Sequence, residues 1–414
     1  MKYGVIGEHL KHSFSKEIHA QIGDYQYEIK EIEPQKLEAF MKERDFLGIN
    51  VTIPYKEKVI PMLDYVDPAA LSIGAVNTVV NRGGKLYGYN TDYSGMKALA
   101  LRIGLNIKGK KVLVIGTGGT SKTATRVLGD LGAKEIIYVS NISVPGAFTY
   151  EEVYAYHTDC EIIFNTSPVG MYPKNDGIPL DLDAFTRLEG ILDVVYNPIK
   201  TNLVQRALAK GIPAESGLYM LGAQAVYASE HFFDKESSDV KELCDRVYSS
   251  VLSSKDNITL IGMPSSGKTT VGKELSYKTG KLFVDTDIEI VKKIGMPISE
   301  YFEKYGEDSF RQVEEEVIAE ISSKNNQIIA TGGGAVLRHD NVRRLKQNGL
   351  VYFIDRSLDK LCPTGDRPLS SNRAALQKRY DERYHIYKSE CDVAIDGDGT
   401  VQEVAELIYK DYTK

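Results

Sequence analysis

The chain of 414 residues contains no tryptophan, only 4 cysteines and no apolar run of the length that spans a bilayer, about 20 residues. The cysteines are scattered at Cys160, Cys244, Cys362 and Cys391, without the paired spacing of a metal site. In a chain of this length they are typical of reduced thiols rather than of a disulfide framework. The first residues also lack the apolar segment and cleavage site of a secretory leader. We therefore expect a cytoplasmic protein that does not bind membranes.

Positive charge is also scarce. The formal net charge is -6, and neither half of the chain carries an excess of Lys and Arg. Because nucleic-acid binding depends on clustered positive charge, the sequence argues against a nucleic-acid partner. What the chain does contain is 42% hydrophobic and 26% charged residues, the balance of a globular protein. At about 150 residues per domain, its length predicts two to three domains.

Two glycine-rich turns stand out, each preceded by a β-branched run and followed by a helical pattern. The first turn follows Lys111–Ile115, which reads as a buried strand, and Ala124, Val127 and Leu128 then fall on one face of a helix. The second turn follows residues 257–261 in the same way. This order of strand, turn and helix is typical of parallel sheets covered by helices, so we expect an α/β fold.

The second turn, Gly262 to Thr269, fits the pattern G-x-x-x-x-G-K-[ST]. Its glycines allow successive backbone N–H groups to face an anion at the start of the helix. Lys268 then reaches the β- and γ-phosphates of a nucleotide, and Thr269 offers a hydroxyl to Mg²⁺. A glycine loop without a ligand is the alternative. The residues predicted to bind ATP are Gly262, Ser265, Ser266, Gly267, Lys268, Thr269 and Thr270.

Two carboxylates, Asp285 and Asp287, follow the next apolar run. Asp285 is placed to support the Mg²⁺ shell and Asp287 to orient an attacking hydroxyl, whereas an Asp-Thr-Asp helix cap is the alternative. The run Gln327–Ala330 leads into Thr331 and three glycines, without the aspartate that motors and GTPases carry at this point. The residues therefore argue against both of these classes.

From about residue 257 to its end, the chain resembles shikimate kinase. The resemblance is carried by the P-loop together with the segments FVDTD, GEDSFRQVE, TGGGAVL, DRPL and ERYHIY. It implies a P-loop kinase domain in which Lys268 and Asp287 are catalytic and Asp287 also holds the ring hydroxyls of the acceptor. The chain departs from the family after the late arginine, where residues 384–387 read YHIY in place of a proline-containing run.

The same resemblance implies how the acceptor and the phosphates are held. Arg311 and Arg383 would bind the substrate carboxylate, although a lone arginine more often forms a surface salt bridge. Arg367, in the lid, would close over the phosphates and is counted with the ATP site. The backbone that lines the acceptor pocket is implied to come from Gly332, Gly333 and Gly334.

The first turn, Gly116 to Ser121, reads G-x-G-G-x-S and suits the close approach of a pyrophosphate to the start of a helix. A turn that serves packing alone is the alternative. An NAD-binding domain usually carries an aspartate or glutamate after the next strand, but here Ser140, Asn141 and Ile142 follow. No arginine follows there to grip a 2′-phosphate either, and Lys122 is the remaining cation we consider. We favour NADP and keep NAD as the alternative.

Over about residues 1–250 the chain resembles shikimate dehydrogenase. The resemblance is carried, in the order of that family, by HSFS, NVTIPYK, GAVNT, YNTD, GTGGTS, NTSPVGM, DVVYNP and LYMLGAQA. It implies that Lys56 and Asp92 form a proton-transfer pair at the oxidised carbon. Reduction of a ketone by hydride needs such a donor, because negative charge develops on the oxygen. Taken singly, Lys56 reads as a solvated lysine and Asp92 as a cap before a helix at Gly95.

The remaining roles in this part of the chain are also implied by the resemblance. Ser13 and Ser15 would bind the substrate carboxylate. The other residues assigned to the dehydrogenase substrate are Thr52, Asn77, Tyr196 and Gln224. The nicotinamide would be bordered by the loop Asn165–Met171, by Tyr196 and by Met220. The residues assigned to NADP are Gly116, Gly118, Gly119, Thr120, Asn141, Met171, Val194, Gly217 and Met220.

We predict a substrate-binding domain at 1–97, completed by about 212–250, a Rossmann-like NADP domain at 98–211, a linker at 251–257 and a P-loop domain with a parallel sheet at 258–414. Both resemblances together imply reduction of 3-dehydroshikimate to shikimate, then phosphorylation of shikimate to shikimate 3-phosphate with ATP and Mg²⁺. One alternative is a quinate/shikimate dehydrogenase with relaxed cofactor use, fused to a kinase for a related polyol acid. Another is a chain with one half acting as a non-catalytic scaffold. The oligomeric state stays open, a homodimer included.

Overall fold

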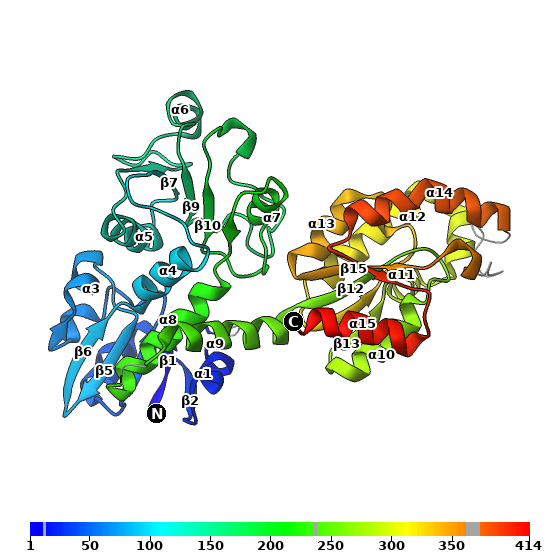
Figure 1. Cartoon of the computed structure of the whole chain (residues 1–414). Coiled ribbons are helices and arrows are strands. Elements are labelled where there is room, and N and C mark those ends of the chain that lie inside the picture. The colour runs from blue at the N-terminus through cyan, green and yellow to red at the C-terminus, as the bar shows by residue number, and fades with distance from the viewer. Residues whose placement is uncertain (11–13, 236–237, 362–372) are drawn as a thin grey trace. The chain divides into compact units, whose positions relative to one another are not determined.

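The computed structural model describes residues 1–10, 14–235, 238–361 and 373–414. Its chain divides into two compact units, Met1–Leu252 and Ser253–Lys414, which can be followed by colour in Figure 1. Two of the predicted site residues, Ser13 and Arg367, lie outside the described residues. Within the described part of the chain, no helix combines the length and the apolar character needed to cross a bilayer.

The first unit begins with a mixed sheet of strand order β2-β1-β3-β5-β6-β4. Its strands are β1 (Tyr3–Gly7), β2 (Tyr27–Glu31), β3 (Gly48–Val51), β4 (Tyr65–Val66), β5 (Thr78–Arg82) and β6 (Lys85–Tyr89). The helical elements among them are α1 (Ser15–Ile22), η1 (Pro34–Lys36), α2 (Leu37–Glu43), η2 (Ile60–Met62) and α3 (Pro68–Ile73). The β5–β6 hairpin turns at Gly83 and Gly84, whose φ angles are 60° and 84°. Two successive residues of positive φ suit glycine and match the twist of a tight hairpin.

Helix α4 (Thr91–Arg102) leads from this sheet into a parallel one of strand order β11-β10-β9-β7-β8. Its strands are β7 (Lys111–Ile115), β8 (Glu135–Val139), β9 (Ile162–Asn165), β10 (Gly190–Asp193) and β11 (Ala214–Glu215). The helical elements that follow these strands are α5 (Gly119–Asp130), α6 (Tyr150–Tyr156), η3 (Leu182–Ala184), α7 (Asn202–Ala209), α8 (Leu218–Phe233) and α9 (Val240–Lys255). The central strands are almost continuously apolar, as expected of strands that helices cover on both faces.

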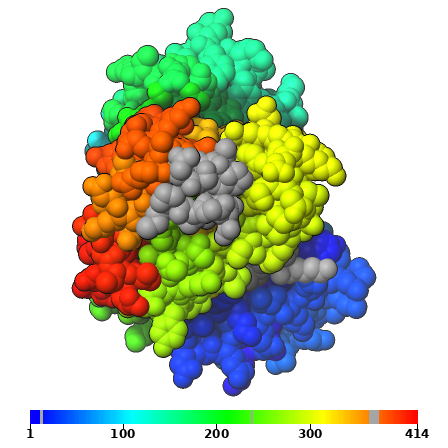
Figure 2. Space-filling model, turned by 90° about the vertical axis from the view of Figure 1, so that its right-hand side faces the viewer, coloured from blue at the N-terminus to red at the C-terminus, as the bar shows by residue number. Residues whose placement is uncertain are grey.

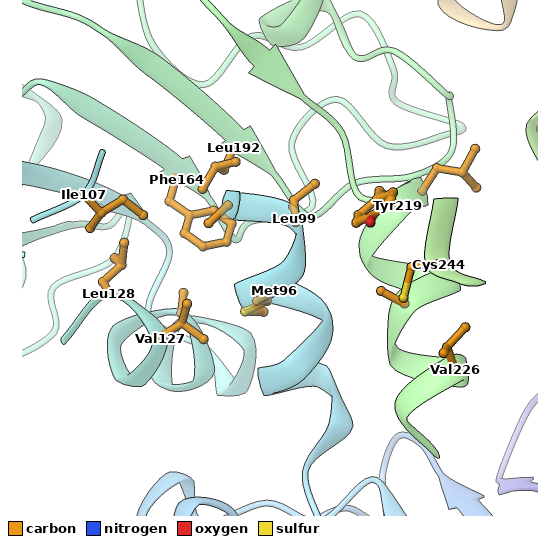
Figure 3. Packing of buried hydrophobic residues seen from close by; sticks show 14 of the residues in the cluster. Met96, Leu99, Ile107, Val127, Leu128, Phe164, Leu192, Tyr219, Val226 and Cys244 are labelled. Carbon is orange, nitrogen blue, oxygen red and sulfur yellow. The ribbon is translucent and has the colours of Figure 1, made fainter. Parts of the chain in front are cut away.

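The core of the first unit is built around α4. Figure 3 shows Met96 and Leu99 of α4 between Phe164 of β9 and Tyr219 of α8, and all four side chains are buried. Burial of one such side chain stabilises the fold by about 1.5–3 kcal/mol. Because α4 also carries Asp92 in its first turn, this packing holds a predicted catalytic carboxylate in place.

The second unit is a parallel sheet of strand order β13-β14-β12-β15-β16 with helices on its faces. Its strands are β12 (Asn257–Ile261), β13 (Leu282–Asp285), β14 (Gln327–Ala330), β15 (Gly349–Asp355) and β16 (Val393–Asp396). Its helical elements are α10 (Lys268–Thr279), α11 (Thr286–Ile294), α12 (Ile298–Ser322), η4 (Ala335–Leu337), α13 (His339–Gln347), η5 (Leu358–Lys360), α14 (Arg373–Glu390) and α15 (Val401–Tyr412). Figure 2 shows the face of this unit on which α12 appears in yellow, α14 in orange and α15 in red.

The expected α/β fold with parallel sheets is confirmed, and β7 and β14 have the predicted bounds. The structure differs from the predicted linker at 251–257, since α9 runs to Lys255 and β12 begins at Asn257. The helix continues because its apolar stripe does, and because Lys281 Nζ donates to the backbone oxygens of Ser253 and Asp256 at 2.7 and 2.8 Å. These bonds satisfy carbonyls that a helix end otherwise leaves without partners.

Candidate functional site

Lys56 and Asp92 lie together in the first unit. Lys56 Nζ donates to Asp92 Oδ2 at 2.5 Å, and the two side chains are 30% and 20% exposed. Asp92 lies inside α4 rather than ahead of a helix at Gly95, because Asn90 caps α4 by accepting the Tyr93 N–H at 3.0 Å. Asp92 therefore lies in the first turn of α4, close to the N-terminus of the helix.

A buried polar network fixes the start of α4. Asn77 Oδ1 accepts the Thr91 N–H at 2.6 Å and the Thr91 hydroxyl at 3.2 Å. Asn50 Nδ2 donates to Thr78 Oγ1 at 3.1 Å, and the Thr78 and Thr91 hydroxyls are 2.9 Å apart. The amide nitrogen of Asn77 has no partner among the described residues, so it is available to a substrate hydroxyl. Asn77 thus positions the turn that carries Asp92 and keeps a donor for a ligand.

The other predicted substrate residues come from separate elements. Ser15 begins α1, and Thr52 lies half-buried directly after β3. Gln224 of α8 lies against α4, because a Cβ on Gly95 would be 3.1 Å from Gln224 Cβ. Tyr196 packs edge-on against Phe14, with ring centroids 5.9 Å apart, and burial raises the pKa of its hydroxyl. A substrate bound between α1, β3 and α8 would contact the predicted residues of all three elements.

The first glycine turn is open to a ligand. Gly116 has φ of 101°, and a Cβ there would lie 3.2 Å from Thr166 Oγ1. No atom lies within 4 Å of a Cβ built on Gly118 or Gly119, and α5 begins at Gly119 without a side-chain cap. No side chain therefore satisfies the start of α5, and an uncapped helix N-terminus suits the pyrophosphate of a dinucleotide. Thr120, also assigned to the cofactor, is exposed in the same turn.

The loop after β8 decides between NADP and NAD in many dinucleotide readers. Here the Ser140 side chain accepts the Ile142 N–H at 3.2 Å, and Asn141 is exposed. Residues 140–149 include no acidic or basic side chain. Lys122, in the first turn of α5, has its Nζ 3.8 Å from Glu57 Oε1 and its side chain exposed. The loop thus leaves room for a 2′-phosphate without providing a cation of its own.

The predicted neighbours of the nicotinamide lie at the carboxyl ends of β9 and β10. Met171 is exposed, and Val194 is half-buried with its N–H donating to Asn165 O at 3.0 Å. Gly217 cannot carry a side chain, since a Cβ there would lie 2.1 Å from Val194 O. Met220, one turn later, has its backbone oxygen 2.7 Å from a Cβ built on Gly95. These contacts join the cofactor side of the unit to α4.

The second glycine turn curls around the end of Lys268. Its Nζ donates to the backbone oxygens of Gly262 and Met263, both at 2.8 Å. Gly262, Ser265 and Gly267 have positive φ angles of 149°, 64° and 95°. The buried Ser266 hydroxyl has no partner among the described residues. A curled backbone with an orphaned hydroxyl and a lysine at its centre fits the phosphates of a nucleotide.

Thr269 and Asp285 are joined at the edge of this turn. The Thr269 hydroxyl donates to Asp285 Oδ2 at 2.8 Å, and Asp285 Oδ1 accepts the Asp287 N–H at 3.0 Å. Asp285 is therefore the cap of α11, as the structural alternative predicted, and it also stands beside the predicted Mg²⁺ ligand. A hydroxyl and a carboxylate are oxygen donors that suit Mg²⁺. Among the described residues, no group of three His, Cys, Asp or Glu side chains is placed to hold a metal ion.

Arg311 meets two carboxylates beside the glycine triplet. Its Nη1 donates to Glu314 Oε2 at 2.6 Å and its Nη2 to Glu307 Oε1 at 3.1 Å. Glu314 is buried, which raises the pKa of its carboxyl, and the Arg311 guanidinium counteracts part of that shift. A Cβ on Gly332 would lie 2.5 Å from Asp287 Oδ1 and 3.3 Å from Glu314 Oε1. The bare backbone of Gly332 is therefore what allows Asp287 and Glu314 to approach the same point.

Arg383 reaches the same triplet from α14. Its Nη1 donates to Gly333 O at 2.9 Å, and the Tyr387 hydroxyl donates to the same oxygen at 2.5 Å. A Cβ on Gly334 would lie 2.2 Å from Arg311 Nη1, so the two arginines flank adjacent residues. Arg311 Nε is buried without a hydrogen-bond partner in the described part of the chain. An acidic ligand would supply the missing acceptor.

Two residues near this site were missed from the sequence. Glu314 lies three residues after Arg311 on α12, and this spacing was the available signal. Arg379 lies one turn before Arg383 on α14 and is half-buried. The pKa of Arg379 is lowered, first by burial and next by the neighbouring charge of Arg383. Arg379 therefore adds a third guanidinium close to Arg383 and Arg311.

Comparisons with known proteins divide the chain in the same way. The family model of the shikimate dehydrogenase substrate binding domain matches residues 5–79, and that of shikimate kinase matches residues 264–413. A shikimate dehydrogenase (NADP(+)) of Clostridium perfringens is 36% identical over 249 residues, which are 55% of this chain and 90% of that protein. Another, from Halothermothrix orenii, is 40% identical over 258 residues, with 54% and 88% covered.

Solved structures show the same similarity over the first part of the chain. Shikimate dehydrogenase 1 from Peptoclostridium difficile superposes with a TM-score of 0.53 at 34% identity, covering 61% of this chain and 98% of that one. A chorismate mutase/shikimate 5-dehydrogenase fusion protein from Clostridium acetobutylicum gives 0.56 at 31% identity, covering 60% and 96%. These proteins account for the first unit, and the kinase family model accounts for most of the second.

Proposed function

The chain belongs to the shikimate dehydrogenase family over its first unit and carries a shikimate kinase domain in its second, and we propose that it performs two consecutive reactions on one acid. It reduces 3-dehydroshikimate to shikimate with NADPH and then phosphorylates shikimate with ATP. The observation that carries this proposal is that each unit holds its own assembled pair, Lys56 with Asp92 and Thr269 with Asp285. The hydroxyl made by the first reaction is the nucleophile of the second.

In the first unit, bound NADPH supplies the hydride that reaches the carbonyl carbon. Lys56 Nζ delivers a proton to the carbonyl oxygen as negative charge develops there, and in the reverse direction it accepts the proton of the hydroxyl. Asp92, at 2.5 Å, holds the ammonium group in place. Asn77 donates to a neighbouring ring hydroxyl, and Ser15 of the same unit binds the carboxylate together with Ser13. These roles follow the family's motif residue by residue.

In the second unit, bound ATP with Mg²⁺ supplies the phosphoryl group. Asp287 orients the acceptor hydroxyl and takes its proton while the new oxygen–phosphorus bond forms and the bond to ADP breaks. Lys268, whose Nζ rests on two backbone oxygens of its own loop, neutralises charge on the β- and γ-phosphates. Thr269 and Asp285 would hold Mg²⁺, which would neutralise charge on the phosphates.

The carboxylate of the acceptor is bound differently in the two units. In the second unit Arg311 and Arg383, which flank Gly333 and Gly334, supply a charged grip. In the first unit the assigned groups are neutral hydroxyls. Arg311 Nε, which is buried without a partner among the described residues, supports this assignment, because a carboxylate oxygen of the acceptor would satisfy it.

Two assays on the full chain test the proposal. Shikimate with NADP should produce NADPH absorbance, and shikimate with ATP and Mg²⁺ should produce ADP. Quinate, tested beside shikimate in both assays, should give a kcat/KM lower by about 10-fold or more. The reason is that the ring carbon that bears its carboxylate also bears an extra hydroxyl. Silence of one assay with the other intact would show that the silent unit is a scaffold. Equal rates with quinate would contradict the proposed substrate.

A further inference from the structure

Asp193 is a buried carboxylate that the proposed chemistry does not use. It is the last residue of β10, its side chain is 0% exposed, and it lies beside Asn165, the last residue of β9. Its Oδ1 accepts the Val195 N–H at 2.9 Å and the Asn165 amide at 3.0 Å, and its Oδ2 accepts the Thr201 hydroxyl at 2.7 Å. These three donors come from two different loops.

The first loop runs over the glycine turn. Asn165 Oδ1 accepts the Ser167 N–H at 3.1 Å and the Ser167 hydroxyl at 2.7 Å. The next residue along from Asn165, Thr166, donates through its hydroxyl to Ile115 O at 2.7 Å, at the point where the turn begins. A Cβ on Gly116 would be 3.2 Å from Thr166 Oγ1 and 3.4 Å from Ser167 N. The orientation of the Asn165 amide, which Asp193 sets, therefore determines how residues 165–171 cover the cofactor turn.

The second loop, residues 194–201, is tied to the first. Thr201 caps α7 by accepting the Val204 N–H at 3.3 Å while its own hydroxyl proton goes to Asp193. A Cβ on Gly170 would lie 3.4 Å from Thr201 Cβ, and the Tyr172 N–H donates to Asn197 O at 3.1 Å. The two loops are therefore in contact at two further places, in addition to their shared contact with Asp193. Between them they carry Met171 and Tyr196, which are predicted to border the nicotinamide, and Val194, which is assigned to NADP.

We propose that Asp193 is a positioning residue for the dinucleotide: it holds the loops 165–171 and 194–201 at one spacing, so that they seat the nicotinamide end of the cofactor. This inference rests on the proposed dehydrogenase function of the first unit. Asp193 itself touches no reacting atom. Its effect reaches the cofactor through Asn165 on one side and Thr201 on the other.

The environment of Asp193 is costly, which argues for a specific purpose. A buried carboxylate is normally paired with a cation. The groups that act on Asp193 are the Val195 N–H, the Thr201 hydroxyl and the Asn165 amide, none of which carries charge. Burial accordingly raises the pKa of Asp193 to about 7, although the three donors oppose the shift. The carboxyl group connects the loops in two ways: Oδ1 accepts from both of them, and Oδ2 holds Thr201 at the far end of the second loop.

The test compares two pairs of variants in the full chain. Asp193→Ala removes both acceptors, whereas Asp193→Asn keeps an oxygen for Val195 and Asn165 and offers an N–H to the Thr201 oxygen. Thr201→Val removes the hydroxyl, and with it both the bond to Asp193 and the cap of α7, whereas Thr201→Ser keeps both. Ser229→Ala, which removes a buried hydroxyl of α8 bonded to Val226 O, controls for general loss of stability. Binding of NADP is titrated directly, and KM is measured for NADP and for shikimate.

We expect Asp193→Ala and Thr201→Val to raise both the Kd and the KM for NADP by about 10-fold, equivalent to about 1.4 kcal/mol. The KM for shikimate in the same assay should change by less than about 2-fold, and ADP formation by the second unit should be unchanged. Asp193→Asn, Thr201→Ser and Ser229→Ala should keep values near those of the wild type. This split separates positioning from a merely structural role, which would lower the folded fraction and leave both KM values alone.

Three outcomes would overturn the inference: an unchanged Kd for NADP in Thr201→Val, an equal rise of both KM values, or a rise confined to shikimate. If Asp193→Ala fails to fold, Thr201→Val against Thr201→Ser decides, because both retain Asp193. Failure of the proposed function is recognised separately. A wild-type chain that binds NADP but does not oxidise shikimate contradicts the function, whereas the effect of Thr201→Val on NADP binding still tests Asp193.

Discussion

Lys56 Nζ and Asp92 Oδ2 lie 2.5 Å apart although 36 residues separate them in the chain. Lys56 lies in the loop after β3, and Asp92 lies in the first turn of α4. Asn77 joins these elements, because its backbone oxygen accepts the Val51 N–H at 2.8 Å while its side chain binds Thr91. The proton-transfer pair is therefore a product of the sheet and not of a local motif.

Lys56→Ala should remove the proton donor and leave the second unit intact. General acid–base catalysis contributes about 100- to 10,000-fold, so kcat for shikimate oxidation should fall by about that factor. ADP formation from shikimate and ATP should keep its wild-type rate. Lys58→Ala, in the same loop but exposed, is the matched control and should retain both activities. Loss of both activities in folded Lys56→Ala would contradict two independent sites.

Lys268→Ala should do the reverse. Its ammonium lies at the centre of the phosphate loop, and without it the charge on the transferred phosphoryl group is not neutralised. We expect kcat for phosphorylation to fall by about 100-fold or more while NADPH formation is unchanged. Lys273→Ala, on the same helix, serves as the control. Both variants are assayed in the full chain for both products.

The sequence predicted the local parts of these sites and missed the contacts between distant segments. Gly262 to Thr269 and the start of α5 could be assigned because strand, turn and helix follow one another directly. Asp193 lies in the segment DVVYNP, but its role was missed, since its partners Asn165 and Thr201 become neighbours only when β9 and β10 pair. The predicted linker differed for a related reason: the residue that closes the end of α9, Lys281, lies beyond the next strand and helix.

The roles of the residues assigned from the resemblance to shikimate kinase also depend on tertiary contacts. Arg311 was assigned from its motif, but its two carboxylate partners were not. Gly332 explains why the motif needs glycine, as a side chain there would strike Asp287 Oδ1. The run of glycines can be recognised in the sequence, but the side chains that pack against it, Asp287 and Arg311, cannot.

Glu314→Gln should weaken acceptor binding in the second unit. The variant keeps an oxygen for Arg311 Nη1 but loses the charge that holds the guanidinium beside Gly334. We expect KM for shikimate in the kinase assay to rise by about 10-fold, with KM for ATP within about 2-fold of the wild type. Glu315→Gln, whose carboxylate pairs with Arg338 and Arg344 instead, is the matched control. A rise confined to the KM for ATP would contradict the assignment of Arg311 to the acceptor.

The cofactor preference should favour NADP over NAD, with Lys122 as the source of charge. It is the cation in the first turn of α5, and its Nζ lies 3.8 Å from Glu57, a contact too long to hold it firmly. We expect Lys122→Ala to lower kcat/KM for NADP by about 5-fold and to leave that for NAD unchanged. Lys108→Ala, before β7, is the control. An equal loss with both cofactors would assign Lys122 to the shared pyrophosphate rather than to the 2′-phosphate.

The pH dependence of stability should carry the signature of Asp193. Burial raises its pKa from the ordinary 3.8 of an aspartate to about 7 in the folded chain, so the folded state keeps a proton that the unfolded state has lost. Stability from this group is therefore full below pH 4 and decreases as pH rises, by about 1.4 kcal/mol per unit, until the folded carboxyl also ionises near pH 7. Asp193→Asn cannot lose that proton and should lack this decrease.

Thermal unfolding of the full chain at pH 5, 6 and 7 measures it: the wild type should lose about 3 °C per pH unit relative to Asp193→Asn in the transition of the first unit. Asp181→Asn, at an exposed position of the same unit, should run parallel to the wild type. A constant difference between wild type and Asp193→Asn across this range would show that Asp193 is already ionised at pH 5 in the folded chain.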